Sequence, residues 1–474
     1  MVFSSHIFLF YFLPVVLLVY YALLGARVSL SWLNLFITIV SYVFYAWFEP
    51  WFVILMWVST LVDFSCGKLI SKPGASRSQR LGALYASMIV NLGMLGFFKY
   101  YMFFMGGVNR LAELFGAGSN LFNIMNIALP IGISFYTFQT MSYTIDVYRG
   151  DAPAVKNLRT FSCFVALFPQ LIAGPIIRYN TVAQQLSKRD HTLDKFTSGV
   201  AIFILGLAKK IILANAAGQI ADGVFAADSP GFLGSWWGIL AYHFQIYFDF
   251  CGYSDMAVGL GRMLGFEFIK NFNAPYHSRD ITDFWRRWHI SLSTFIRDYL
   301  YIPLGGNRKG VRRTYINLIV AFFLSGLWHG AQMTFVLWGV FHGAMLIWER
   351  VRKKESFFAR LPKIPSIILT NIVVLFIWVT FRAPDLGQMA QYWASMVGLR
   401  GALPSTYLLY SDIFSASSIL MMLMIAVFVW QPFQAHEWVK KLDSKRYAVL
   451  LGLFFLAIVT MFTQTFNPFL YFQF

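Results

Sequence analysis

The sequence reads TDFWRRWHISLS over residues 282–293 and SGLWHG over residues 325–330, and we refer to residues 282–330 as one stretch. It places two histidines, His289 and His329, together with a pair of arginines and several tryptophans, inside a chain that is otherwise largely apolar. Ionisable side chains at membrane depth are energetically expensive, and they mark functional sites by default. We therefore expect this stretch to carry the chemistry and the remaining helices to be organised around it.

The composition indicates an integral membrane protein. Of 474 residues, 58% are hydrophobic, 19% are aromatic and only 12% are charged, whereas about a quarter of the residues of a soluble protein are charged. The formal charge of +17 is spread over short basic clusters between apolar runs, which is typical of loops that face the cytoplasm. No nucleic-acid-binding module is recognisable, so a nucleic-acid partner is excluded.

Apolar runs and basic loops predict an all-α polytopic protein with a single domain over residues 1–474. The N-terminal spans lie in 1–150, a catalytic core with re-entrant and interfacial helices in 151–350, and the C-terminal spans in 351–474. Positive-inside counting places the N-terminus outside the cytoplasm and gives about twelve crossings. The predicted crossings are near residues 7–24, 32–47, 51–70, 81–104, 127–147, 196–220, 233–250, 314–330, 334–347, 367–381, 413–429 and 447–463.

One apolar segment, residues 161–177, breaks this alternation. It contains Pro169, Gly174 and Pro175, and basic residues that belong in the cytoplasm follow it. Irregular backbone cannot face lipid, because its polar groups would lack hydrogen-bond partners. We therefore predict a re-entrant or broken helix that is buried against protein.

The basic region that follows residue 250 is too polar to span a membrane. Within it, apolar residues from Asp283 to Tyr301 fall on one helical face, with Thr282 as N-cap and an i,i+4 pair between Asp283 and Arg287. This pattern predicts one amphipathic helix, either at the membrane interface or beneath the helical bundle. A turn containing Gly305 and Gly306 ends it.

Two histidines are the candidate catalytic groups. His329 ends an apolar run between Gly326 and Gly330, which allow close approach of backbone or substrate. An imidazole titrates near neutral pH and can take a proton from a hydroxyl, which is the step that acyl transfer requires. His289 could orient the substrate or polarise a carbonyl. The competing interpretation is that both are hydrogen-bonded interior histidines.

Other polar residues allow two interpretations each. Asp249, Ser254 and Asp255 follow a predicted span, either as a helix-ending turn or as substrate contacts. Lys209 and Lys210 either extend toward the interface or bind an anionic group. His243 and His342 are expected to pack within the helices. A basic cluster is either a topology signal or a site for the phosphates of an acyl donor; it consists of Arg308, Lys309, Arg312 and Arg313.

Several long motifs resemble the membrane-bound O-acyltransferase family. They are FWRRWHISLS (284–293), RDYLY (297–301), LGGNR (304–308) and LWHG (327–330), with support from LPIGISFY (129–136), YTIDVYRG (143–150), LIAGP (171–175) and YFDFCGYSDMA (247–257). The likeness runs over the whole chain and favours the branch that O-acetylates alginate or a similar exopolysaccharide. Branches that modify peptidoglycan or transfer D-alanine to teichoic acid remain alternatives.

The resemblance implies a helical bundle of roughly 11–13 transmembrane helices, with re-entrant and interfacial helices around a central channel. It implies His329 as general base, with a transient acyl carrier as its alternative role, and His289 as the second histidine of the same channel. The motif residues expected to contact donor or substrate are Trp285, Arg286, Arg287, Asp249, Ser254, Asp255, Asn307, Arg308 and Trp328.

The resemblance also sets the expected cellular context. It implies acetyl-CoA as the acyl donor, no bound cofactor and no metal, a position in the bacterial inner membrane among its lipids, and a periplasmic acetyltransferase or relay protein as partner. The competing class of function is a transporter or channel that moves an acyl group or a polysaccharide precursor without bond chemistry.

Overall fold

The computed structural model describes residues 1–116, 121–352, 360–431, 433–464 and 466–470. Within these residues the secondary structure is helical, and the only β pairing is an isolated bridge between Pro230 and Ala402. The chain forms two compact units, Met1–Gly199 with Leu260–Ile269, and Val200–Gly259 with Lys270–Phe474. The expected all-α membrane fold is confirmed.

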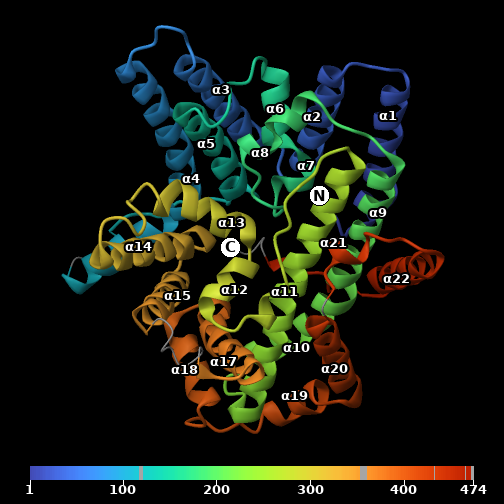
Figure 1. Ribbon diagram of the computed structural model, residues 1–474. Coiled ribbons are helices and arrows are strands. Elements are labelled where there is room, and N and C mark those ends of the chain that lie inside the picture. Colours follow the sequence, from blue (N-terminus) through green and yellow to red (C-terminus); the bar gives the residue numbers. More distant parts are fainter. Residues whose placement is uncertain (117–120, 353–359, 432, 465, 471–474) are drawn as a thin grey trace. The chain divides into compact units, whose positions relative to one another are not determined.

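The first unit contains the N-terminal helices, coloured blue to green in Figure 1. A π-helical turn, η1 (Phe8–Phe12), leads into α1, and the long α4 begins with a capping box made by Ser76 and Gln79. The helices are α1 (Leu13–Gly25), α2 (Leu30–Ala46), α3 (Phe52–Ile70), α4 (Arg77–Leu114), α5 (Ile133–Arg149), α6 (Leu158–Ala166), α7 (Phe168–Leu171) and α8 (Tyr179–Ser187).

A buried polar network, the Asp63 cluster, joins α3, α4 and α5. The Asn91 amide of α4 donates to both carboxylate oxygens of Asp63 at 3.0 and 2.9 Å. The Asn91 carbonyl oxygen accepts from Ser59 at 2.6 Å and from Thr140 at 3.2 Å. These four side chains are almost completely buried, so each hydrogen bond replaces one that water would otherwise make.

The proline-containing segment is broken, as predicted. It forms α6 and the single turn α7, with an extended Leu167 between them at φ −46° and ψ 102°. Every residue from Phe161 to Ile177 is buried except Ser162. Protein side chains therefore cover this irregular backbone, as the cost of unpaired polar groups requires.

The second unit contains the predicted catalytic region and the C-terminal helices. It begins within α9 (Leu193–Ala208), which is followed directly by the π-helical η2 (Lys209–Ala214) and by α10 (Asn215–Phe225). The remaining elements are α11 (Gly231–Met263), η3 (Pro275–His277), α12 (Ile281–Arg287), α13 (Ile290–Ile296), η4 (Arg297–Tyr301), α14 (Val311–His329), α15 (Met333–Arg352), α17 (Lys363–Arg382), α18 (Leu386–Met396), α19 (Thr406–Ile413), α20 (Ala416–Trp430), α21 (Ala435–Trp438) and α22 (Ser444–Thr463).

The helix that carries Asp249 is longer than predicted. We expected a crossing over 233–250 followed by a turn, but α11 continues without a break to Met263. The helix-ending interpretation of Asp249, Ser254 and Asp255 is therefore wrong. The two carboxylates form ion pairs with lysines of η2, and this pairing allows polar side chains to lie on a buried helix.

The predicted amphipathic helix is wrong in its continuity. It is divided into α12, α13 and η4, with a break at Trp288 and His289. Asp280, rather than Thr282, caps α12 by accepting a hydrogen bond from the Asp283 amide at 2.6 Å. The i,i+4 pair between Asp283 and Arg287 is confirmed at 2.8 Å.

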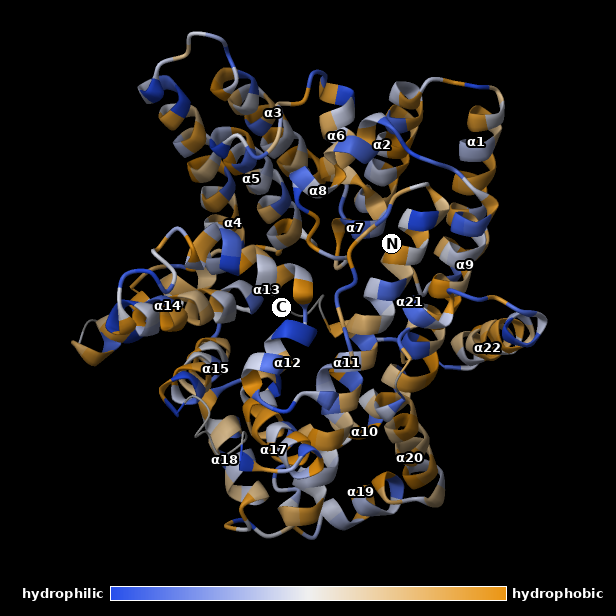
Figure 2. Ribbon diagram, in the orientation of Figure 1, coloured by the Kyte–Doolittle hydropathy of each residue, from blue (hydrophilic) through white to orange (hydrophobic). Residues whose placement is uncertain are grey.

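Six helical segments in the described residues are long and apolar enough to cross a membrane, or seven if the bent pair α19 and α20 is counted as one span. Figure 2 shows hydrophobic residues along the outer helices α20 and α22, and large apolar side chains such as Leu420, Val427 and Phe455 are exposed there. This exposure suits a lipid environment. The further crossings that the sequence predicts stay predictions.

Candidate active site

His289 lies at the break between α12 and α13, in a backbone conformation that few residues adopt. Its φ is +44° and its ψ is 55°, in the left-handed region that is strained for a residue with a Cβ atom. Asn271 holds this position from a neighbouring loop: its carbonyl accepts from the Ile290 amide at 2.9 Å, and its side-chain oxygen lies 3.2 Å from His289 Nδ1. The break points the imidazole into the core, where it is fully buried.

The hydrogen bonds around Asn271 fix the tautomer of His289. Asn271 Oδ1 also accepts from the backbone N–H of Ser291 at 3.1 Å, so this atom is an acceptor and His289 Nδ1 must carry the proton. The second ring nitrogen, Nε2, then carries the lone pair. Burial lowers the pKa of His289 to about 3, and the ring is therefore neutral at physiological pH.

His329 is the last residue of α14, and glycines position it. An added Cβ on Gly326 would overlap the backbone oxygen of Phe335 in α15, and one on Gly339 would overlap the backbone oxygen of Phe322. The two helices therefore cross in direct backbone contact at these glycines. Gly330 similarly leaves room for the Phe335 ring. The expectation of close backbone approach beside His329 is confirmed.

The two predicted catalytic histidines lie together. Their ring centroids are 6.4 Å apart with an interplanar angle of 58°, and both side chains are buried. Aromatic rings enclose them: His329 contacts Trp328, Trp338 and Phe381 at centroid distances of 4.9, 4.9 and 5.1 Å. His289 contacts Phe250 at 4.6 Å and Trp328 at 6.0 Å. We call these six residues the histidine–aromatic cluster.

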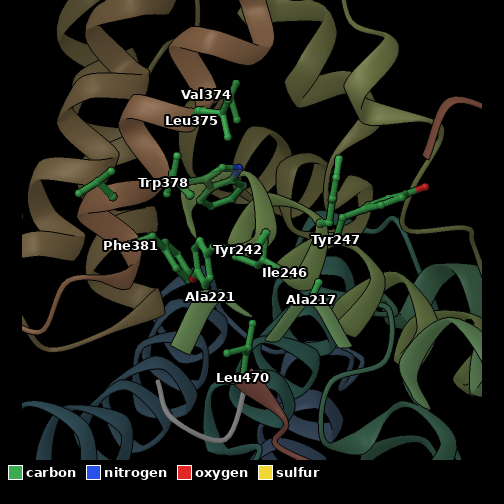
Figure 3. Packing of buried hydrophobic residues seen from close by; sticks show 14 of the residues in the cluster. Ala217, Ala221, Tyr242, Ile246, Tyr247, Val374, Leu375, Trp378, Phe381 and Leu470 are labelled. Carbon is green, nitrogen blue, oxygen red and sulfur yellow. The ribbon is translucent and has the colours of Figure 1, made fainter. Parts of the chain in front are cut away.

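The surrounding core comes mainly from α10, α11 and α17. Figure 3 shows Trp378, Phe381, Tyr242 and Leu470 gathered in it. Trp288 packs against Trp378 at 5.1 Å, which joins the α12–α13 break to α17. Such large rigid rings exclude water from the two imidazoles and limit their rotation.

Trp285 has no described contact with the two histidines but packs against Trp338, which contacts His329. Its indole N–H donates to Nδ1 of His342 in α15 at 3.3 Å, and its ring lies 5.6 Å from Trp338. His342 is thus a hydrogen-bonded packing residue, as predicted. His243 is also structural, because it stacks on Tyr276 at 3.6 Å and lies 3.2 Å from Asn371 Oδ1.

Four polar residues that we predicted to contact donor or substrate lie outside the histidine–aromatic cluster. Arg286 is exposed, and Arg287 is held by Asp283 and by the Asn273 carbonyl. Asn307 and Arg308 are exposed in the turn between η4 and α14. No described contact joins these four residues to the histidines, so their role in donor binding stays a prediction.

The two carboxylates of α11 that we predicted to contact substrate form ion pairs with lysines. Asp249 Oδ1 lies 2.6 Å from Lys210 Nζ, and Asp255 Oδ2 lies 2.6 Å from Lys209 Nζ, while Ser254 is buried between them in sequence. Both alternatives for the lysines, extension to the interface and binding of an external anion, are replaced by internal ion pairs. Participation of Asp249, Ser254 and Asp255 in substrate binding stays a prediction.

Sequence reasoning missed Asn271, Trp338 and Phe381. None stands in a distinctive motif, and each reaches the histidines only through the packing of separate elements. Among the residues that the structure describes, no group of three or more His, Cys, Asp and Glu side chains could hold a metal ion.

Comparison with known proteins identifies the family of this chain. The family model described as MBOAT, membrane-bound O-acyltransferase family, matches residues 3–383. The chain belongs to the membrane-bound O-acyltransferase family. This match includes both histidines of the cluster, and it confirms the predicted class of enzyme, an O-acyltransferase.

Individual members of this family are similar over most of the chain. A probable alginate O-acetylase AlgI of Pseudomonas putida is 41% identical, with all of both chains covered. A protein of the same description from Pseudomonas aeruginosa is 47% identical over 81% of this chain and 73% of its own. A peptidoglycan O-acetyltransferase of Helicobacter pylori is 35% identical over 85% of this chain and 80% of its own. The chain is therefore a membrane O-acyltransferase of the alginate O-acetylase type.

Proposed function

We propose that this protein takes an acetyl group from a cytoplasmic thioester donor and passes it across the bacterial inner membrane for O-acetylation of alginate or a similar exopolysaccharide. The observation that carries the proposal is the pair of buried imidazoles, 6.4 Å apart between centroids, inside one aromatic enclosure. Of two such rings on separate elements of an O-acyltransferase, one can take the proton of the acceptor hydroxyl and the other can hold the acceptor in place.

In this proposal His329 is the general base. A ring nitrogen of His329 takes the proton of the acceptor hydroxyl as the oxygen attacks the thioester carbonyl. The tetrahedral intermediate then collapses, the carbon–sulfur bond breaks, and the imidazolium returns the proton to the leaving thiolate. Exclusion of water by the surrounding rings suppresses hydrolysis of the thioester.

His289 is a substrate-positioning partner in the same step. Asn271 accepts from the Nδ1 proton, so Nε2 presents a lone pair that can accept a hydrogen bond from a second hydroxyl of the acceptor sugar, beside the one that His329 deprotonates. The strained backbone at His289 supports a functional interpretation, because strain of this kind is concentrated at sites where geometry matters.

Donor and partner are further parts of the proposal. The donor is acetyl-CoA, whose phosphates are attracted by the exposed basic turn that contains Arg308, Lys309, Arg312 and Arg313. On the opposite side, a periplasmic acetyltransferase or relay protein receives the acetyl group. The names of the alginate O-acetylase relatives support the choice of acceptor.

The test is transfer by the purified protein in lipid nanodiscs. With acetyl-CoA labelled in the acetyl group, we expect CoA release and transfer of label to an alginate oligosaccharide supplied with the periplasmic partner. His329→Ala should lower the rate by roughly a hundredfold or more, because it removes the base, while the melting temperature stays within a few degrees. Exposed His6→Ala is the matched control and should retain the wild-type rate.

Three outcomes would contradict parts of this proposal. Full turnover by His329→Ala would exclude His329 as the base. Movement of label across the membrane without thioester cleavage would favour a transporter. Transfer to peptidoglycan fragments but not to alginate would keep the chemistry and replace the acceptor.

A further inference from the structure

The segment Phe466–Leu470 enters the core of the second unit and is held there by buried polar groups. Asp249 Oδ2 accepts from the Leu470 amide at 2.9 Å, and Lys210 Nζ donates to the Pro468 carbonyl. Asn215 Nδ2 donates to the Phe466 carbonyl at 3.1 Å. Three backbone groups of a short segment are therefore bound by η2, α10 and α11.

Apolar contacts complete this docking site. The Phe469 ring stacks on Tyr253 with centroids 4.5 Å apart, and Leu470 is only 3% exposed. Gly218 of α10 lies so close to Phe466 that an added Cβ would be 3.2 Å from the Phe466 ring. The segment thus fills a shaped recess lined by α10 and α11.

The segment supplies a hydrogen-bond partner to each ion of the pair beneath it. Lys210 Nζ lies 2.6 Å from Asp249 Oδ1 as an ion pair, and it donates hydrogen bonds to Asn215 Oδ1 and to the Pro468 carbonyl. Both Lys210 and Asp249 are about 2% exposed. Two buried charges cost several kcal/mol in desolvation, so removal of the segment would leave each ion with an unmet hydrogen-bonding group.

The docked segment shares a hydrophobic core with Phe250 of the histidine–aromatic cluster. Asp249 precedes Phe250, the ring that contacts His289 at 4.6 Å, and Leu470 belongs to the same hydrophobic core as Phe250 and Trp285. Figure 3 places Leu470 below Ala221 and Tyr242 in that core. Asp249 therefore links the segment to the turn of α11 that carries Phe250.

We propose that Lys210 and Asp249 form a receptor for the chain's own segment Phe466–Leu470, and that the docked segment positions Phe250 and His289 for acyl transfer. Lys210 and Asp249 are then positioning residues and not donor-binding residues. The docking stands on the contacts alone, whereas its effect on the rate rests on the proposed acyltransferase function.

The experiment replaces the pair by apolar residues of similar volume, Lys210→Met with Asp249→Leu. Exchange of a buried ion pair for packed apolar side chains is often neutral for stability, so we expect the melting temperature to stay within about 4 °C. Hydrogen exchange of the amides in 466–470 should accelerate roughly tenfold or more. The kcat of acetyl transfer should fall about tenfold at an unchanged KM for acetyl-CoA.

The matched control is the neighbouring pair on the same two elements, Lys209→Met with Asp255→Leu, which has no described contact with the segment. It should leave amide exchange in 466–470 at the wild-type rate. Unchanged exchange in the Lys210 and Asp249 variant would overturn the docking proposal, whatever the protein catalyses. Faster exchange at an unchanged kcat would keep the receptor and overturn the positioning role. If wild-type protein transfers no acetyl group, the proposed function fails while the exchange result still decides the docking.

Discussion

The Asp63 cluster of the first unit and the histidine–aromatic cluster of the second are both buried and polar, yet they are built differently. In the Asp63 cluster, the Asn91 amide donates to the carboxylate at 3.0 and 2.9 Å, and its oxygen accepts from Ser59 and Thr140 at 2.6 and 3.2 Å. Around His289 and His329 the neighbours are rings, with Asn271 on one nitrogen of His289. The first arrangement satisfies polar groups for stability, whereas the second keeps imidazoles dry and oriented for a reaction.

A substitution in the Asp63 cluster should change stability more than any other substitution considered below. Asn91→Ala removes both donors to Asp63 and the acceptor for Ser59, so it should lower the free energy of unfolding by about 3 kcal/mol. Thermal unfolding in detergent would measure this as a lower melting temperature. The rate of acetyl transfer per folded molecule should remain that of wild type.

The control for Asn91→Ala is Ile89→Ala on the same helix, where the side chain is 70% exposed. It should have little effect on unfolding. If Asn91→Ala instead abolished acetyl transfer at an unchanged melting temperature, the Asp63 cluster would be part of the catalytic machinery and the contrast with the histidines would be lost.

A smaller effect is expected at Asn271. Substitutions of this residue test whether it orients the His289 ring or only stabilises the fold. Asn271→Ala removes the acceptor that fixes the Nδ1 proton of His289, so kcat should fall about tenfold, as for other residues that orient a histidine. Asn271→Asp keeps the acceptor oxygen and should restore much of the rate. Equal losses in both variants would show that the position matters for folding and not for the tautomer.

The smallest effect is expected at the exposed basic turn. Arg308→Ala with Lys309→Ala should raise the KM for acetyl-CoA about threefold at low salt, because exposed charges attract a polyanion only weakly, and the difference should diminish at high salt. The kcat should not change. A loss of kcat at an unchanged KM would place the turn in the catalytic step and remove it from the proposed donor route.

Prediction from sequence succeeded where local pattern was sufficient. The helical segments, the broken segment at Pro169 and the Asp283–Arg287 pair all follow from residues that are neighbours in the chain. The prediction was wrong for the length of α11 and for the continuity of the helix at His289. The polar run after Asp249 indicated a turn, but Lys209 and Lys210 neutralise its carboxylates from another element, and the periodicity over 283–301 gave no sign of the break that Asn271 stabilises.

The amino-acid sequence by itself determined the membrane class, the family and the identity of the two histidines, because hydropathy and long motifs are properties of contiguous residues. Tertiary structure alone decided that His289 and His329 meet 6.4 Å apart, that Asn271 sets the tautomer, and that Phe466–Leu470 docks on a buried ion pair. These outcomes depend on helix crossings at Gly326 and Gly339 and on contacts between residues up to 258 positions apart in the chain. No local sequence pattern encodes such distances, because the energy that fixes them comes from packing between separate elements.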